Sequence, residues 1–152
     1  MTKVAVLATV ALGLWVGAGY AHAHGDDMHA EASKAAHGGQ VQVAGANHFE
    51  LVVAKTGKDA GANPVVVYLT DGSGKKLPSA GASGTATLLT GKDKSVLTLS
   101  PDGDNRMKGM GHYASAPGMK AIVSITLPGK SAEQARFTPL AAPSDGHSDH
   151  KH

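Results

Sequence analysis

The sequence predicts an all-β protein, an immunoglobulin-like antiparallel β-sandwich of seven or eight strands with flexible polar tails. Three observations lead to this prediction. Apolar and polar residues alternate in short segments between about residues 40 and 140, turn-forming Gly, Pro, Asn and Asp separate these segments at roughly regular spacing, and no stretch has a convincing helical pattern. A small barrel is the alternative arrangement of the same strands.

The first half of this region holds three expected strands. VQVA and HFELVVA, between 41 and 54, flank the hairpin-type turn GAN. PVVVYLT, at 64–70, begins at a proline and ends at the turn sequence DGSG. Strand alternation places one set of apolar side chains on the core face: Phe49, Leu51, Val53, Val65, Val67 and Leu69.

The second half supplies the remaining strands. GTATLLT and KSVLTLS, between 84 and 100, are separated by the compact turn GKD. RMKGMGHYA predicts a weaker strand, because Gly109 and Gly111 dilute it. KAIVSITLP and QARFTPL, between 120 and 140, close the series. Their expected core residues are Val123, Ile125, Leu127, Ala135 and Phe137.

The first 23 residues have the layout of a secretory signal peptide. Lys3 precedes the apolar run VAVLATVALGLWV and the small-residue segment GAGYAHA. We therefore expect a periplasmic or secreted protein with no membrane insertion after cleavage. Signal peptidase requires small residues at positions −3 and −1, and cleavage after Ala21 or after Ala23 meets this requirement. The first residue of the mature chain is then His22 or His24. The expected divisions of the chain are a signal peptide at 1–23, a flexible histidine-containing lead-in at 24–39, the β-domain at 40–140 and a histidine-rich tail at 141–152.

The composition excludes several functional classes. The chain of 152 residues has 14 Lys and Arg against 12 Asp and Glu, with no basic run, which argues against nucleic acid as a partner. It has no cysteine, and this excludes disulfides, thiolate catalysis and Cys-based zinc sites. No set of residues predicts a catalytic centre, so we expect a protein that is not an enzyme.

Four segments together resemble a known family. HGGQVQVAGANHFELVV, VVVYLTDGSGKKLP, GTATLL and MKAIVSITLPGKSAEQARFTP are similar to segments of small exported β-domain proteins associated with bacterial heavy-metal efflux systems, of the copper type. The resemblance covers about Gly38 to Pro139 and rests mainly on turn and core residues. It implies a periplasmic setting, a link to metal handling and a periplasmic efflux adaptor protein as a possible partner. It implies no ligand set.

The nine histidines point to metal binding by their placement. Neutral imidazole is the commonest nitrogen ligand for copper, zinc and nickel. If His22 is first, its α-amine, two backbone amides and the His24 imidazole form the square-planar nitrogen set that Cu(II) and Ni(II) prefer. If His24 is first, its α-amine and imidazole form a two-nitrogen chelate, which resembles the N-terminal copper ligands of small copper-resistance β-sandwiches. Seven histidines lie outside the expected β-domain: His22, His24, His29, His37, His147, His150 and His152.

RMKGMGH holds a second candidate metal site. Thioether sulfur favours Cu(I), and alternation places Met110 and His112 on one face with Lys108 while Met107 faces the core. Two ligands are too few for tight binding, and the alternative is a Gly-rich edge strand with scattered residues.

Two functional hypotheses from different classes follow. The first is a periplasmic protein that binds a metal ion, buffers it or delivers it to a heavy-metal efflux system. Cu(II) is favoured, Cu(I) is possible, and zinc and nickel are the alternatives. The second is a structural module that docks onto an efflux adaptor or another exported protein, with incidental histidines. An enzyme with an N-terminal copper is disfavoured, because the only tryptophan, Trp15, lies in the expected signal peptide.

Overall fold

The computed structural model describes residues 34–55 and 61–141, and every regular element in this part of the chain is a β-strand. All the strand pairs are antiparallel, which confirms the predicted all-β class. The eight strands are β1 (Gln40–Ala44), β2 (Asn47–Val53), β3 (Gly61–Asp71), β4 (Ser83–Thr90), β5 (Asp93–Pro101), β6 (Arg106–Tyr113), β7 (Lys120–Thr126) and β8 (Glu133–Phe137).

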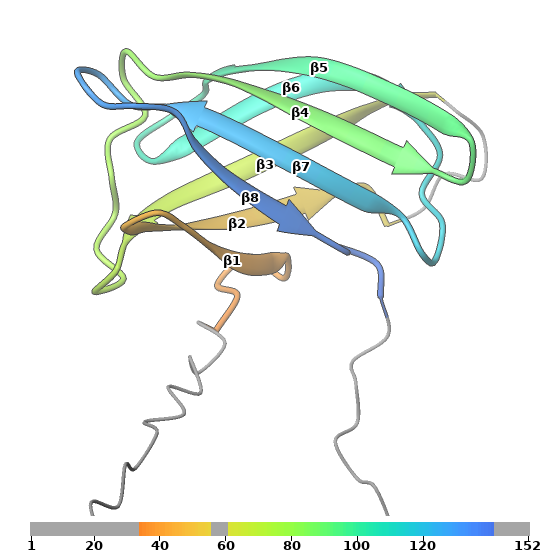
Figure 1. The fold of residues 1–152 in the computed structure, drawn as a ribbon, viewed down its shortest axis with the longest axis horizontal. Coiled ribbons are helices and arrows are strands. Elements are labelled where there is room, and N and C mark those ends of the chain that lie inside the picture. The colour runs from red at the N-terminus through yellow and green to blue at the C-terminus, as the bar shows by residue number, and fades with distance from the viewer. Residues whose placement is uncertain (1–33, 56–60, 142–152) are drawn as a thin grey trace, which may run out of the picture.

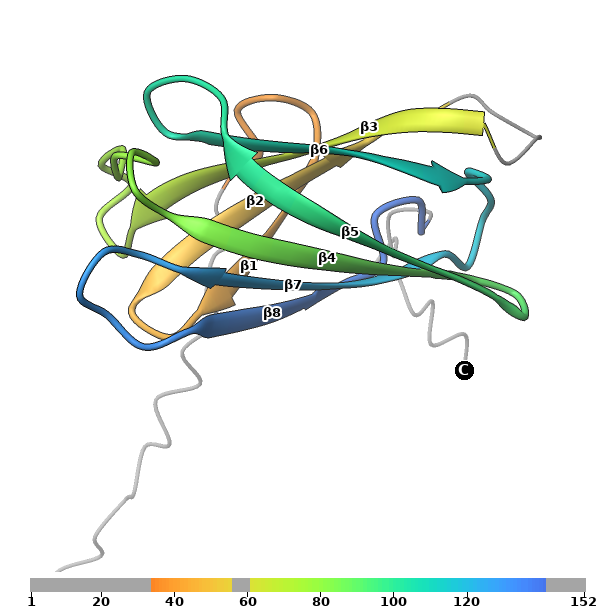
Figure 2. The ribbon, with the colours of Figure 1, turned by 90° about the horizontal axis from the view of Figure 1, so that it is seen from above.

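The strands form one continuous sheet in the order β1-β2-β3-β6-β5-β4-β7-β8. This sheet folds over on itself into two facing halves, as Figures 1 and 2 show. We call β1, β2, β3 and β6 the first half-sheet, and β5, β4, β7 and β8 the second half-sheet. The order places β7 beside β4 after the consecutive strands β4, β5 and β6, which is the Greek-key connection common in sandwiches.

The two halves join where β5 crosses from one to the other. β5 pairs with β4 over most of its length but with β6 only at Ser100 and Pro101. Gly109 and Gly111 make this close crossing possible: a Cβ atom at 109 would lie 2.4 Å from the Leu97 side chain, and one at 111 would lie 2.7 Å from it. The sequence suggested that these glycines mark a weak strand at the edge of a sheet. The structure shows instead that they allow β5 to pass close to β6. β6 is an eight-residue interior strand between β3 and β5.

The space between the halves is filled by the residues that alternation predicted. All the expected core residues are buried, with relative exposures of 8% or less. Met107 and Met119 are also fully buried, and Tyr113 donates a hydrogen bond from its hydroxyl to the carbonyl of Pro64. The largest fully buried side chains include Phe49, Leu51, Leu69, Leu88, Leu99, Met107, Met119 and Ile125.

The two edge strands, β1 and β8, close the fold through side chains. At one end the Gln40 side chain accepts a hydrogen bond from the Thr138 amide at 2.7 Å. At the other end the Glu133 carboxylate accepts hydrogen bonds from the Ala46 amide and the Asn47 side chain. No ladder joins β1 to β8 within the described residues. The sheet is therefore nearly barrel-shaped, with a seam held at its two ends.

Candidate metal-binding site

The segment before β1 folds over the outer face of the first half-sheet, and its two glycines explain how. Gly38 has a φ of 74°, a left-handed conformation that favours glycine. At Gly39 a Cβ atom would lie 2.3 Å from the backbone oxygen of Leu51 on β2, so a side chain there would collide with the strand. The sequence HGG therefore lets the chain lie close against β2 and brings His37 over that face.

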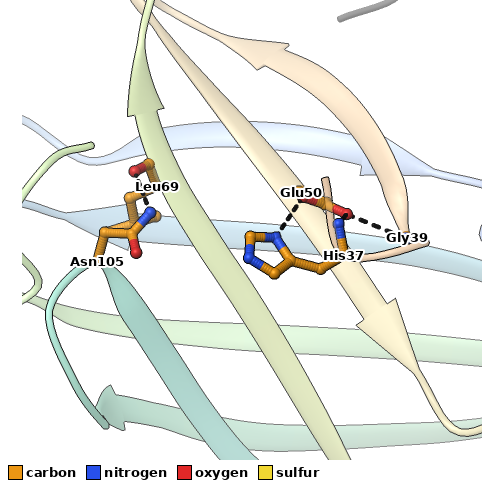
Figure 3. A network of polar contacts seen from close by, with 5 residues as sticks. All are labelled: His37, Gly39, Glu50, Leu69 and Asn105. Atoms are coloured by element: carbon orange, nitrogen blue, oxygen red, sulfur yellow. Dashed lines mark hydrogen bonds and ion pairs between the residues drawn. The ribbon is translucent and has the colours of Figure 1, made fainter. Parts of the chain in front are cut away.

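His37 is held in place by a buried carboxylate. Glu50 occupies an outward position of β2 but is only 6% exposed, because the segment before β1 covers it. Its Oε1 accepts hydrogen bonds from the backbone amides of His37 at 2.7 Å and Gly39 at 3.1 Å. Its Oε2 lies 2.8 Å from Nδ1 of the His37 ring. Figure 3 shows these contacts. One carboxylate thus fixes both the backbone and the ring of His37.

These contacts determine the charge of Glu50. Burial by itself raises the pKa of the carboxyl group, but the hydrogen bonds from the His37 ring and from the amides of Gly39 and His37, together with the nearby His37 charge, lower it by more. The net result is a pKa below the usual value of 4.5. Glu50 is therefore an ionised carboxylate at neutral pH, and a carboxylate only accepts hydrogen bonds.

The state of Glu50 in turn determines the tautomer of His37. Because the carboxylate is an acceptor, Nδ1 of the ring is the donor, and a neutral ring then carries its free lone pair on Nε2. Tyr68, the cross-strand partner of Glu50, fixes the ring plane by stacking on it, with the ring centroids 3.5 Å apart and an interplanar angle of 4°. The His37 side chain remains 39% exposed. Nε2 is thus the nitrogen available to a ligand.

This arrangement is the one that supports histidine ligands in many metal centres. A metal-binding histidine commonly donates its second ring N–H to a carboxylate, which sets the tautomer and increases the basicity of the ligating nitrogen. A cavity of about 200 Å³ adjoins the ring and is also lined by Lys34, Thr70, Lys76 and Asn105. Asn105 is itself fixed, since its side chain donates to the Leu69 carbonyl at 2.9 Å (Figure 3). The site offers one well-oriented imidazole beside a small cavity.

Further ligands do not gather around His37 within residues 34–55 and 61–141. No group of three or more His, Asp or Glu side chains in this part of the chain could hold a metal ion. The described residues supply one oriented ligand, and a complete site requires others.

Met110 and His112 lie on the outer face of β6, as alternation predicted. Lys108, Met110 and His112 are exposed, whereas Met107 is fully buried. Met110 is 56% exposed. His112 borders a hollow of about 70 Å³ beside the β4–β5 turn, together with Asp93 and Ser95. In the described part of the chain, no hydrogen bond orients either the Met110 or the His112 side chain.

The two candidate ligand positions do not meet. Tyr68, which stacks on His37, pairs with Arg106, and His112 lies six residues further along β6. At the rise of a strand this is about 20 Å. His48 lies farther still from His112, because it pairs with Thr70. The buried Met119 does not reach either position, since it is part of the core.

Six predicted ligands lie outside the described residues. They are His22, His24, His29, His147, His150 and His152. The expected cleavage sites after Ala21 and Ala23 lie there too. These remain predictions from the sequence.

Sequence reasoning found His37 but missed its partners. Glu50 and Tyr68 occupy outward strand positions, where charged and aromatic side chains usually face solvent, so neither was expected to contribute to a site. The available signal was the sequence HGG directly before a strand. Two glycines at this point indicate a close backbone approach, and a close approach covers an outward residue of the neighbouring strand.

Comparisons with known proteins add no family assignment. No protein-family model, no curated protein and no solved structure matches the chain. The resemblance to heavy-metal efflux proteins therefore stays a prediction. Among the residues that the structure describes, no helix is long and apolar enough to cross a membrane.

Proposed function

We propose that the protein is an exported metal-binding protein that holds copper, with zinc or nickel as alternatives, and passes it to a heavy-metal efflux system. The observation that supports this function best is the His37–Glu50 pair. A buried carboxylate at Nδ1 and a stacked tyrosine hold one imidazole and leave its Nε2 for a ligand. Such support is expected of a ligand and is unnecessary for a solvent-exposed surface histidine.

The remaining ligands come from the chain's other histidines in this proposal. His29 and the N-terminal histidine, His22 or His24, precede His37 in the sequence. An N-terminal α-amine with its own imidazole supplies two nitrogens, and His37 adds a third. Cu(II) prefers such nitrogen ligands, and zinc and nickel also accept them. The ion is cargo in this mechanism.

Capture and release follow from ligand exchange. A fixed imidazole lowers the entropic cost of capture, because it is already oriented. The absence of thiolates keeps the affinity moderate, so a partner that offers better ligands removes the ion. Metal and protons compete for an imidazole lone pair, so metal binding depends on pH.

The test is Cu(II) binding by the mature exported protein in competition with chelators of graded strength, with nitrogen hyperfine coupling read by electron paramagnetic resonance. His37→Ala removes the ligand. Glu50→Gln keeps the shape of the supporting side chain but removes its charge. We expect each to weaken Cu(II) binding by about 10- to 100-fold, the usual effect of losing such support. His112→Ala is the matched control, and circular dichroism checks the fold of each variant.

Two outcomes reject the proposal. If His37→Ala and Glu50→Gln both bind Cu(II) as tightly as the unmodified protein, the pair does not serve metal binding. The proposal also fails if the unmodified protein has no affinity tighter than micromolar for Cu(II), Zn(II) or Ni(II). In either case the docking module, an exported protein that binds an efflux adaptor without metal, becomes the better description.

A further inference from the structure

The charged residues at the outward positions of the second half-sheet are all positive. Outward positions on β4, β5, β7 and β8 alternate with the buried core positions. Three of these outward residues are cationic, namely Lys94, Lys120 and Arg136, and none is Asp or Glu. Glu133 at the start of β8 is bonded to the β1–β2 turn at the seam. The outward residues of this half-sheet therefore favour an anionic ligand.

A cavity lies at one end of this face, next to the β1–β8 seam. Its volume is about 420 Å³, within the range of small-molecule sites. Leu89 and Ile122 give it an apolar surface, Lys120 and Arg136 add two positive charges, and Gln42 adds an amide from β1. Apolar walls with a few polar groups are typical of sites for small organic ligands.

The two cations are placed to act together. Ile122 pairs with Arg136 and Ala121 pairs with Phe137, so Lys120 and Arg136 are diagonal neighbours on one face. Diagonal Cβ atoms on paired strands lie roughly 7–8 Å apart, and long side chains from both positions can reach one anionic group. Neither forms an ion pair within residues 34–55 and 61–141. Arg106, by contrast, forms an ion pair with Asp102, with 2.9 Å between the guanidinium nitrogen and the carboxylate oxygen.

We propose that this cavity binds a small amphipathic carboxylate, such as a medium-chain fatty acid, free in solution. The carboxylate lies between Lys120 and Arg136, and the apolar chain lies against Leu89 and Ile122. Arg136 suits this role because its planar guanidinium donates two parallel hydrogen bonds to a carboxylate. The site is separate from the proposed metal site, since the two cavities share no lining residue.

The test is a titration of the full mature chain with octanoate, followed by amide chemical shifts in nuclear magnetic resonance. We expect saturable shifts centred on Leu89, Ile122 and Arg136. The double variant Lys120→Gln/Arg136→Gln should weaken binding at least tenfold, because charge-assisted hydrogen bonds are the stronger ones. Lys75→Gln/Lys108→Gln is the matched control: it removes two exposed charges that lie outside this face, and it should leave octanoate binding unchanged.

Two further arms make the result decisive. Octanol has the same apolar chain without the charge and should bind at least tenfold more weakly than octanoate. Vesicles of phosphatidylcholine with phosphatidylglycerol test whether the charged face serves a membrane surface instead. The proposal is overturned if octanoate gives no saturable shifts, if the cavity double variant keeps full affinity, or if only the vesicles bind.

Discussion

His37 and His112 lie on the outer face of the same half-sheet, yet their surroundings differ. His37 has a buried carboxylate at Nδ1, a tyrosine ring stacked on its plane and its own amide bonded to the same carboxylate. His112 has an exposed position on β6 beside an exposed methionine, and the described residues give it no such support. The first ring has one orientation, whereas the second is held only by its backbone.

The difference shows that one surface histidine is held by its neighbours and the other is not. Both residues have the right chemistry, and the spacing of Met110 and His112 resembles a ligand pair more closely than the lone His37 does. Support comes instead from neighbours that are distant in sequence, 13 residues away for Glu50. Orientation and basicity of the imidazole depend on these neighbours. The following predictions give the expected effect of each neighbour on metal binding and stability.

The largest effect is expected from Gly39→Ala. The added Cβ atom would lie 2.3 Å from the Leu51 backbone oxygen, so the segment before β1 must move away from β2. His37 then loses its position over Glu50. We expect a loss of about 1–3 kcal/mol in the free energy of unfolding from the steric conflict. We also expect about a 10- to 100-fold loss of Cu(II) affinity. Chemical denaturation and chelator competition measure the two effects.

Gly61→Ala is the matched control for this substitution. A Cβ atom at Gly61 meets no atom within 4 Å, and the residue has no left-handed backbone. Both measured quantities should stay near those of the unmodified protein. Equal metal affinity in Gly39→Ala and Gly61→Ala would show that the cover over Glu50 is irrelevant to binding.

The second prediction concerns pH and separates Glu50 from the other acids. Its pKa is lowered in the folded state, so its contribution to stability is complete above its usual value of 4.5 and is lost as the pH falls through the lower folded value. We expect the free energy of unfolding of the unmodified protein to fall more steeply below about pH 5 than that of Glu50→Gln. Urea denaturation between pH 6 and pH 3 measures this. Parallel curves would show that the carboxylate is not stabilised by its three donors.

The fold was largely predictable because β alternation depends on local sequence. Phe49, Leu51, Val123 and Ile125 alternate with residues of the outward face, and each is buried as expected. The order of the strands in the sheet was harder to predict, because no local pattern indicates that β6 lies between β3 and β5. The glycines of β6 illustrate the limit. They suggested a weak edge strand. The Leu97 side chain of β5 packs directly against them, and this contact explains why an interior strand has glycine at both positions.

The candidate site was predictable only in part, for a related reason. Histidine chemistry identified His37, but its support depends on a chain segment that folds over β2. Alternation places Glu50 outward, and this is correct for the strand taken alone. Burial of that outward position is a tertiary effect of the HGG segment. Pattern rules for single strands do not contain it.

A smaller effect is expected at Tyr68. Stacking between its ring and His37 fixes the imidazole plane without touching either ring nitrogen. Aromatic pairs contribute about 0.5–1.5 kcal/mol, so Tyr68→Leu should lower Cu(II) affinity by about two- to tenfold. Tyr68→Phe keeps the ring and should keep the affinity. If Tyr68→Phe lowers the Cu(II) affinity as much as Tyr68→Leu does, the contribution of Tyr68 comes from its hydroxyl group and not from stacking.

The smallest effect on Cu(II) binding is expected from His112→Ala and from Met110→Leu. Along β6, His112 lies about 20 Å and Met110 about 13 Å from Arg106, the partner of Tyr68, and effects at such separations are usually independent. Each variant should change Cu(II) affinity by less than about twofold, and stability by less than about 0.5 kcal/mol, because both side chains are exposed. Cu(I) provides the sharper contrast. A thioether and an imidazole two residues apart on one strand can share a soft ion, so Met110→Leu should weaken Cu(I) binding while leaving Cu(II) binding intact. If His112→Ala instead abolishes Cu(II) binding and His37→Ala does not, support by a buried carboxylate is not what selects the ligand, and β6 carries the metal.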